Sequence, residues 1–165
     1  MIIVCGLHAA QIQIDLHKAK SVIGILSPET PHPEYDNIEN HLKLTFNDIN
    51  VETPGLITPH EQDARRLISF VESWNQKQPL LIHCWAGISR STASAFAALC
   101  MLRPKVDELE IAQELRKASP SATPNRLITK QVDHILGRQG RMLAAIEAIG
   151  RGANAYEGAP FTLHL

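Results

Sequence analysis

Residues 80–102 read LLIHCWAGISRSTASAFAALCML. The apolar run that ends at His83 predicts a buried strand. From Arg90 onward, small and apolar residues recur at helical spacing, with Phe96 and Cys100 on one face. The segment therefore predicts a strand, a loop and a helix in succession. In open α/β sheets, ligands bind beside such a loop, at the carboxyl end of the strand.

The first half of the chain predicts strands alternating with helices, and the second half predicts helices alone. Strands are expected at Ile2–Cys5, at Ser21–Leu26 and through Leu42, Leu44 and Phe46. Helices are expected at 9–19, from Thr58-Pro59, after Asp107, from Thr123-Pro124 and at 141–150. The fold class that follows is α/β, with a mostly parallel central sheet flanked by helices on both faces.

Several of these elements carry specific expectations. The apolar face of the first helix is assigned to four residues at helical spacing: Ala9, Ile12, Leu16 and Ala19. The second helix is expected to begin with Thr58 as N-cap and Glu61 completing a capping box. Residues 28–40, rich in proline and acids, predict an irregular surface loop. The tail that ends at Leu165 carries no interpretable pattern.

Length and composition fit one domain spanning residues 1–165. The chain has 165 residues, against roughly 150 for an average domain. Hydrophobic residues make up 44% and charged residues 20%, which is ordinary for a globular protein. Lys plus Arg total 16 and Asp plus Glu total 17, so the net charge is −1. No overall cationic field is available to hold nucleic acid or an anionic membrane, so neither is an expected partner.

The cysteines and the amino terminus point to a reducing compartment. The three cysteines are far apart and form no CxxC pair, which argues against a disulfide framework or a zinc knuckle. Polar residues follow the short apolar run at Ile2–Val4 too soon for a signal peptide. The histidines show no H-x-x-x-H spacing, so no metal or other cofactor is expected. A soluble cytoplasmic protein is the expectation.

The loop between Cys84 and Arg90 has the features of an anion site. A helix begins at its far end, so the N–H groups of the loop and of the first turn can converge on one point. Gly87 allows the backbone conformations that such a nest requires. Arg90 adds a planar fork that matches two oxygens of a phosphate. The expected anion-binding residues are Trp85, Ala86, Gly87, Ile88, Ser89 and Arg90.

Cys84 lies beneath this nest, where amides and Arg90 favour a thiolate over a thiol. Ser91 is placed to donate a hydroxyl to the sulfur, and His83 to support the loop through its ring nitrogens. The chance that one of the cysteines has His, Gly, Arg and Ser or Thr at these offsets is about 4 × 10⁻⁵ from composition alone. Cys5 and Cys100 have no arginine six residues on, so both are interpreted as core residues.

The segment His83–Ser91, HCWAGISRS, resembles the active-site signature of the cysteine-dependent protein tyrosine phosphatases. The alanine before Gly87 and Ser89 before Arg90 make it more similar to the dual-specificity branch than to the classical one. The resemblance implies the phosphatase fold over residues 1 to about 138. It also implies hydrolysis of phosphomonoesters through a phosphocysteine on Cys84.

The resemblance also implies an aspartate that protonates the leaving group and then activates water. The family takes it from a loop roughly thirty to forty residues before the cysteine. Asp48 fits that spacing and follows a predicted strand. Asp63, within the first turn of a capped helix, is the second candidate, and Asp36 is a distant third.

Further roles are implied for residues outside the loop. In related phosphatases a Pro-Asn segment similar to Pro124-Asn125 braces the signature loop, although Asn125 can equally be a helix cap. Gln131 is in place to position water. The indole of Trp85 is expected to pack under the loop or against substrate.

The implied partner is a phosphorylated protein or peptide, with phosphotyrosine favoured and dual specificity left open. The loop contains no lysine or second arginine, which disfavours a phosphoinositide substrate. The main alternative is a pseudophosphatase that binds phosphoproteins without turnover. A rhodanese-type sulfur transferase is less consistent with His83, Gly87 and Ser91.

Overall fold

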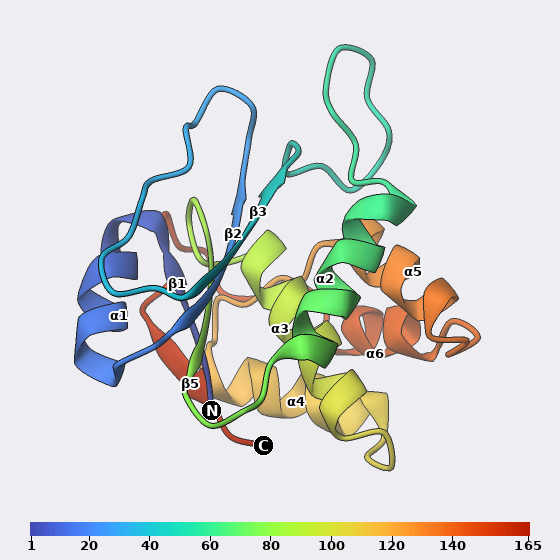
Figure 1. The fold of residues 1–165 in the computed structure, drawn as a ribbon. Helices are drawn as coiled ribbons and strands as arrows, with labels where there is room; N and C mark the ends of the chain where they lie inside the picture. The colour runs from blue at the N-terminus through green and yellow to red at the C-terminus, as the bar shows by residue number, and fades with distance from the viewer.

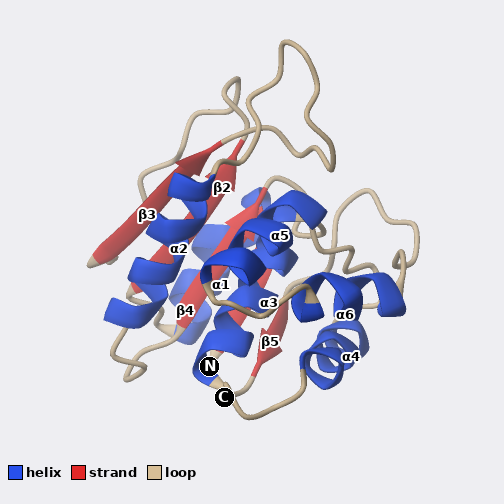
Figure 2. Cartoon of the chain, turned by 90° about the vertical axis from the view of Figure 1, so that its right-hand side faces the viewer, coloured by secondary structure: helices blue, strands red, loops and turns tan.

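Four parallel strands and one antiparallel edge strand form a five-stranded sheet. The computed structural model describes all residues from 1 to 165. The strands are β1 (Ile2–Gly6), β2 (Ser21–Leu26), β3 (Asn40–Thr45), β4 (Leu80–Cys84) and β5 (Phe161–Leu163). Their order is β3-β2-β4-β1-β5, and only β5 runs antiparallel, beside β1 (Figure 2). The predicted α/β class with a mostly parallel sheet is confirmed.

Helices cover both faces of the sheet, but unequally. Helix α1 (Ala10–His17), preceded by the short 3₁₀ helix η1 (Leu7–Ala9), lies alone on one face (Figure 1). The other face carries α2 (Glu61–Ser73), α3 (Arg90–Leu102), α4 (Glu108–Ala118), α5 (Arg126–Ile135) and α6 (Arg141–Ile149). None of the helices has the length and apolar character needed to cross a membrane.

The strands separate two apolar clusters of very different size. In β1, Ile2 and Val4 face the cluster under α2–α6, which contains 31 buried residues. Ile3 and Cys5 face the cluster of seven buried residues under α1. Because both faces are covered, the central strands are apolar along their whole length instead of alternating with polar residues.

The carboxyl ends of β1–β4 all lie at one edge of the sheet. The connections that leave this edge include two long loops, residues 27–39 after β2 and 46–60 after β3, which rise above the sheet in Figure 1. The loop after β4 leaves the same edge, between those of β2 and β1. This edge is therefore where segments distant in sequence meet.

The predicted apolar face of the first helix is wrong for Ile12 and Leu16, although Ala9 and Ala19 do pack against the cluster under α1. Ile12 is 66% exposed and Leu16 is 67% exposed, whereas Ala10 and Ile14 are buried against the sheet. The helix itself was predicted correctly, but it is rotated so that a different pair of apolar residues packs inward.

The second helix begins at Glu61, three residues after the predicted cap at Thr58. The backbone N–H of His60 donates to the carboxylate of Asp63 (2.9 Å), so the capping box is formed by these two residues and not by Thr58 and Glu61. The loop before the helix stays extended because Ile57 exchanges hydrogen bonds with Asn47.

The tail, which has no interpretable sequence pattern, is ordered against the sheet. Its last residues form β5, and Phe161 pairs with Val4 of β1. Upstream of β5, the backbone N–H of Ala153 donates to the carbonyl of Pro120 (2.9 Å). The segment between these points crosses the carboxyl edge of the sheet, and both chain termini lie at the opposite edge (Figure 1).

Candidate active site

The loop between β4 and α3 turns its carbonyl groups outward. We call residues 84–90 the signature loop. Four of its carbonyls accept N–H groups from surrounding segments: Leu7 to Trp85 (3.0 Å), Gly158 to Ala86 (2.8 Å), Thr123 to Ile88 (2.9 Å) and Asn125 to Ser89 (3.2 Å). The amides of these four residues donate to no protein atom, and the Gly87 N–H donates to the sulfur of Cys84. Carbonyls directed outward leave the N–H groups directed inward, which is the arrangement of an anion nest.

Gly87 is the residue that lets the loop close against the sheet. Its φ is +72°, a left-handed conformation that residues with a side chain rarely adopt. A Cβ at this position would lie 2.6 Å from the backbone nitrogen of Gly6 and 2.7 Å from the carbonyl carbon of Cys5. These contacts are with strand backbone, which cannot move aside. The chain therefore requires glycine here for both torsion and space.

Replacing Gly87 by alanine is expected to lower both the stability and the oxyanion affinity of the protein. The left-handed torsion alone costs about 1–2 kcal/mol, and the collision with β1 adds to it. Gly55→Ala is a matched control, because Gly55 also has a positive φ but nothing lies within 4 Å of its Cβ position. Thermal unfolding and phosphate binding should show a larger loss for Gly87→Ala, and equal losses would contradict the steric argument.

Cys84 is the last residue of β4, and its sulfur lies at the centre of the loop. The side chain is 1% exposed. The N–H of Gly87 donates to Sγ at 3.2 Å, and Ser91 Oγ lies 3.2 Å from the same atom. Both groups can stabilise a negative charge on the sulfur. The sequence placed Ser91 beside the cysteine, and the structure brings the two together.

Neither of the other cysteines can pair with Cys84 without backbone movement. Cys5 points to the α1 side of the sheet, while Cys84 belongs to the cluster on the opposite face. Cys100 lies ten residues along α3 from Arg90, which is about 15 Å. A disulfide needs Cβ atoms roughly 4 Å apart. Burial raises the pKa of both the Cys5 and Cys100 thiols to about 12, consistent with core positions.

Two protein acceptors fix Nη1 of the Arg90 guanidinium, while its Nε has no hydrogen-bond partner. Its Nη1 donates to the hydroxyl of Ser27 and to the carbonyl of Phe46, both at 3.0 Å. The side chain is 5% exposed, and Nε is buried without a hydrogen-bond partner. Buried polar atoms are rarely left unsatisfied. The unpaired Nε edge is the face of a guanidinium that binds two oxygens of a phosphate.

Asp48 lies beside the signature loop. Its Oδ1 accepts hydrogen bonds from the Ser89 hydroxyl (2.7 Å) and from the Asn125 amide (3.0 Å). Its Oδ2 lies 3.7 Å from Arg90 Nε, and the side chain is 35% exposed. One oxygen is thus fixed by two donors while the other faces the anion site. The other two candidates for the catalytic acid lie elsewhere. Asp63 caps α2, and the backbone N–H of Asp36 donates to the Gln11 side chain of α1.

Asn125 connects three parts of the site. Its Oδ1 accepts N–H groups at the start of α5, so it is the N-cap of that helix. Its Nδ2 donates to Asp48 and to the carbonyl of Ile49, and its backbone N–H donates to Ser89 in the signature loop. Asn125 therefore caps α5 and also braces the signature loop. Gln131, the residue predicted to position water, lines a small cavity with Asp63.

His83 faces away from Cys84, into a group of ring side chains on the α1 side of the sheet. Its Nε2 lies 3.0 Å from the hydroxyl of Tyr35, which comes from the loop after β2. His32 and His41 complete the group around Gly24, where a Cβ would lie 2.8 Å from His83 Nε2. Each of the three histidines has one buried ring nitrogen without a partner.

Burial lowers the pKa of these histidines, so they are neutral in the native protein. The pKa of both His83 and His41 falls from 6.5 to about 4, mainly because burial penalises the charged ring. The pKa of His32 is also lowered by burial. The structure holds no group of three or more His, Cys, Asp or Glu arranged to bind a metal ion.

The free energy of unfolding is expected to fall as the pH drops from 6.5 towards 4. In this range the unfolded chain protonates His83 and His41 while the folded protein does not, so acid favours unfolding. The fully buried His83 alone accounts for a loss on the order of 3 kcal/mol. Denaturant unfolding measured across this range tests the prediction. His41→Gln should flatten the pH dependence, whereas the exposed His164→Gln should not; equal slopes in both variants would contradict it.

The indole of Trp85 neither packs beneath the loop nor becomes fully exposed. It is half-buried at the side of the loop, between the rings of His8 and Tyr156. The backbone of Trp85 belongs to the nest, as its carbonyl points outward to Leu7. The side chain therefore extends toward β1 and the tail.

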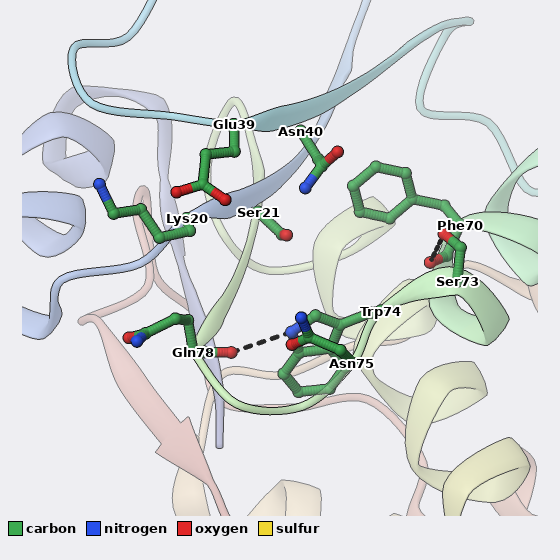
Figure 3. Close-up of a pocket in the computed structure, with 9 residues that line it drawn as sticks. All are labelled: Lys20, Ser21, Glu39, Asn40, Phe70, Ser73, Trp74, Asn75 and Gln78. Atoms are coloured by element: carbon green, nitrogen blue, oxygen red, sulfur yellow. Dashed lines mark hydrogen bonds between the residues drawn. The ribbon is translucent and has the colours of Figure 1, made fainter.

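A polar cavity of about 170 Å³ lies at the other end of the sheet (Figure 3). Lys20, Ser73 and Trp74 are among its lining residues, and the Trp74 indole donates to the carbonyl of Gln78 (2.9 Å). The length of β4, about 13 Å, separates this cavity from Cys84. It contributes nothing to the anion site.

Three residues or segments of the site have no clear sequence signal. Ser27 holds Arg90 but is marked only by its position at the end of a buried strand. Tyr35 lies in a loop whose composition indicates only a surface segment. Gly158 supports the signature loop from a tail that has no pattern. All three act through contacts between segments far apart in sequence.

Comparison with known proteins gives the same family as the signature. The protein-tyrosine phosphatase family model matches residues 50–127. The crystal structure of DUSP15 superposes with a TM-score of 0.64 and 21% identity, covering 90% of this chain and 92% of that chain. Human DUSP28 gives 0.62 and 18%, covering 90% and 89%. No curated protein sequence matches.

A third similar structure is the human tyrosine phosphatase-like serine/threonine/tyrosine-interacting protein, with a TM-score of 0.60 and 20% identity over 84% of this chain and 92% of that one. In fold the chain is similar to these phosphatases of the tyrosine and dual-specificity type. The match to residues 50–127 confirms the resemblance of the signature to the protein tyrosine phosphatases, and the fold is shared with dual-specificity phosphatases. Asp48 and the tail lie outside the matched segment.

Proposed function

We propose that the protein hydrolyses phosphomonoesters on proteins or peptides through a phosphocysteine formed on Cys84. Phosphotyrosine is the favoured substrate residue, and phosphoserine or phosphothreonine are secondary ones. The partner is therefore a phosphorylated protein, and neither nucleic acid nor a membrane has a role in the reaction.

The observation that carries this proposal is the unpaired edge of Arg90. Arg90 Nε is buried without a hydrogen-bond partner, since Asp48 Oδ2 lies 3.7 Å away, and the free amides of the signature loop point to the same site. A phosphate fits both requirements at once, with two oxygens on the guanidinium and the others on the amides. The sulfur of Cys84 lies at the base of that site.

In the first step the Cys84 thiolate attacks phosphorus, so that an S–P bond forms as the P–O bond to the substrate breaks. Arg90 and the loop amides stabilise the charge on the three equatorial oxygens. Asp48 gives its proton to the leaving oxygen, and the free alcohol departs. Oδ2 is the oxygen suited to this role, because Oδ1 already accepts two hydrogen bonds.

In the second step water attacks the phosphocysteine. Asp48, now ionised, takes a proton from the water, and the S–P bond breaks to release inorganic phosphate. The Ser91 hydroxyl, 3.2 Å from Sγ, stabilises the departing thiolate. Asn125 and Ser89 keep Asp48 in place through both steps.

The test is a panel of phosphotyrosine, phosphoserine and phosphothreonine peptides and a phosphoinositide, assayed for phosphate release with EDTA present. We expect turnover of phosphotyrosine peptides that vanadate blocks and EDTA does not. Binding of the peptides without any turnover would favour the pseudophosphatase alternative. A requirement for added metal, or preference for the phosphoinositide, would overturn the proposal.

A further inference from the structure

The tail places an aromatic side chain beside the signature loop. Figure 1 shows the C-terminal segment, drawn in red, reaching the carboxyl edge of the sheet before it enters β5. Tyr156 of this segment packs edge-to-face on Trp85, with ring centroids 5.5 Å apart. On its other side Trp85 packs edge-to-face on His8, at 6.0 Å. We call His8, Trp85 and Tyr156 the aromatic rim.

The aromatic rim remains open to solvent. Tyr156 is 82% exposed, the highest value among the large apolar side chains of the protein. His8 is exposed as well, and Trp85 is half-buried. Faces of the rings that do not contact one another are thus free to pack against another aromatic group. The Tyr156 hydroxyl makes no hydrogen bond within the protein, so nothing but the contact with Trp85 occupies this side chain.

The backbone on either side of Tyr156 is fixed. Before it, Ala153 N–H donates to the carbonyl of Pro120. After it, Gly158 N–H donates to the carbonyl of Ala86 in the signature loop (2.8 Å). The Glu157 carboxylate fills the space beside Gly6, where a Cβ would lie 2.2 Å from Oε1. An exposed ring held this firmly loses little freedom when it binds a partner.

The rim and the proposed acid lie on opposite sides of the anion site. The sheet order is β3-β2-β4-β1-β5, and the signature loop follows the central strand β4. Asp48 follows β3 on one side, while His8 follows β1 and Tyr156 precedes β5 on the other. Trp85 is adjacent to Cys84, so the two Cα atoms are about 3.8 Å apart. A peptide whose phosphate occupies the loop therefore passes next to the rim.

We infer that the aromatic rim binds an aromatic side chain flanking the phosphorylated residue and so selects among phosphopeptides. The inference rests on the proposed phosphatase function, because it assumes a phosphopeptide in the signature loop. Tyr156 is then a specificity-determining residue. Edge-to-face packing of one further ring corresponds to a preference of about three- to tenfold in kcat/KM.

The experiment compares two phosphotyrosine peptides that differ only in a flanking phenylalanine or alanine, each assayed with wild type, Tyr156→Ala and Tyr156→Phe. Wild type and Tyr156→Phe should prefer the phenylalanine peptide, through KM and not kcat. Tyr156→Ala should lose the preference. Ile12→Ala is the matched control, since Ile12 is also an exposed apolar residue (66%) but lies on α1, where it should leave the preference unchanged.

Three results would overturn the inference. The first is a wild-type enzyme that does not distinguish the peptides, and the second is a Tyr156→Ala variant that still does. The third is an equal loss of kcat in Tyr156→Ala for both peptides and for para-nitrophenyl phosphate, which would mean that the ring only supports the loop. Retention of the preference by Tyr156→Phe would show that the ring, and not the hydroxyl, contacts the flanking side chain.

The experiment distinguishes an error in the aromatic-rim proposal from an error in the proposed phosphatase function. If wild type hydrolyses para-nitrophenyl phosphate but shows no flanking preference, the function stands and the rim proposal is wrong. If no substrate is hydrolysed, the phosphatase proposal is wrong. Fluorescence polarisation of the same labelled peptides then tests the rim directly, since equal affinity for both peptides would refute it independently of turnover.

Discussion

Cys84→Ser is expected to lower kcat for aryl phosphates by about 10⁴-fold or more, the scale of loss when a hydrolase loses its nucleophile. Serine preserves the size of the side chain and can accept the Gly87 N–H that now reaches the sulfur. A hydroxyl, however, is almost un-ionised at neutral pH, and the donors around it cannot make it an effective nucleophile. Steady-state hydrolysis of para-nitrophenyl phosphate measures the loss.

Binding should survive this substitution, because Arg90 and the loop amides are unchanged. The Kd of Cys84→Ser for a phosphotyrosine peptide is expected to stay within about threefold of wild type, since those contacts are made in the ground state. Cys5→Ala is the matched control: it lies on the neighbouring strand but on the other face of the sheet, so kcat should be retained. Turnover by Cys84→Ser, or its loss in a folded Cys5→Ala, would remove the central claim.

The strand, loop and helix over residues 80–102 were predictable because they depend on near neighbours in sequence. β4 and α3 lie where the pattern placed them, and the loop between them is short. The proximity of Ser91 to Cys84 follows from the same local geometry. The position of Asp48 beside Arg90 was also expected, although only from the family resemblance and not from local pattern.

The predictions are wrong where the sequence allows two similar alternatives, either two apolar faces of one helix or two capping boxes at one helix start. In α1 the apolar residues alternate through Ile12, Ile14 and Leu16, so two faces of the helix are similarly hydrophobic. Packing against the sheet selects Ile14, which no periodicity could decide. At α2, Thr58–Glu61 and His60–Asp63 are both spaced as a capping box. The extended loop at Ile57 favours the second one.

The parts that the sequence could not predict are contacts between distant segments. Ser27 and the carbonyl of Phe46 come from two different strand ends, yet they jointly hold Nη1 of Arg90. Gly158 reaches the signature loop from more than seventy residues away. Such contacts depend on the order of strands in the sheet, and strand order is not encoded in the pattern of any single element.

Asp48→Asn is expected to lower kcat about 10²- to 10³-fold with little change in KM, because proton transfer contributes on this scale. The amide can still accept from Ser89 and Asn125 through Oδ1, so the loop keeps its geometry. It cannot supply a proton to the leaving oxygen. The loss should be larger for phenyl phosphate than for para-nitrophenyl phosphate, whose leaving group needs less protonation. Steady-state kinetics with both esters, across a range of pH, measure it.

The Asp63→Asn variant tests whether Asp63 acts in catalysis or only stabilises the start of α2. The Asp63 carboxylate accepts the His60 N–H at the start of α2, and the asparagine amide oxygen can still accept it, so Asp63→Asn should cost only about 0.3–1 kcal/mol from the lost negative charge at the helix N-terminus and leave kcat unchanged. The pH profile adds a second criterion. A descending limb that reports the catalytic acid should disappear in Asp48→Asn and persist in Asp63→Asn. If Asp63→Asn instead reduces kcat and abolishes that limb, the acid is Asp63, and the hydrogen bonds that fix Asp48 serve only to brace the signature loop.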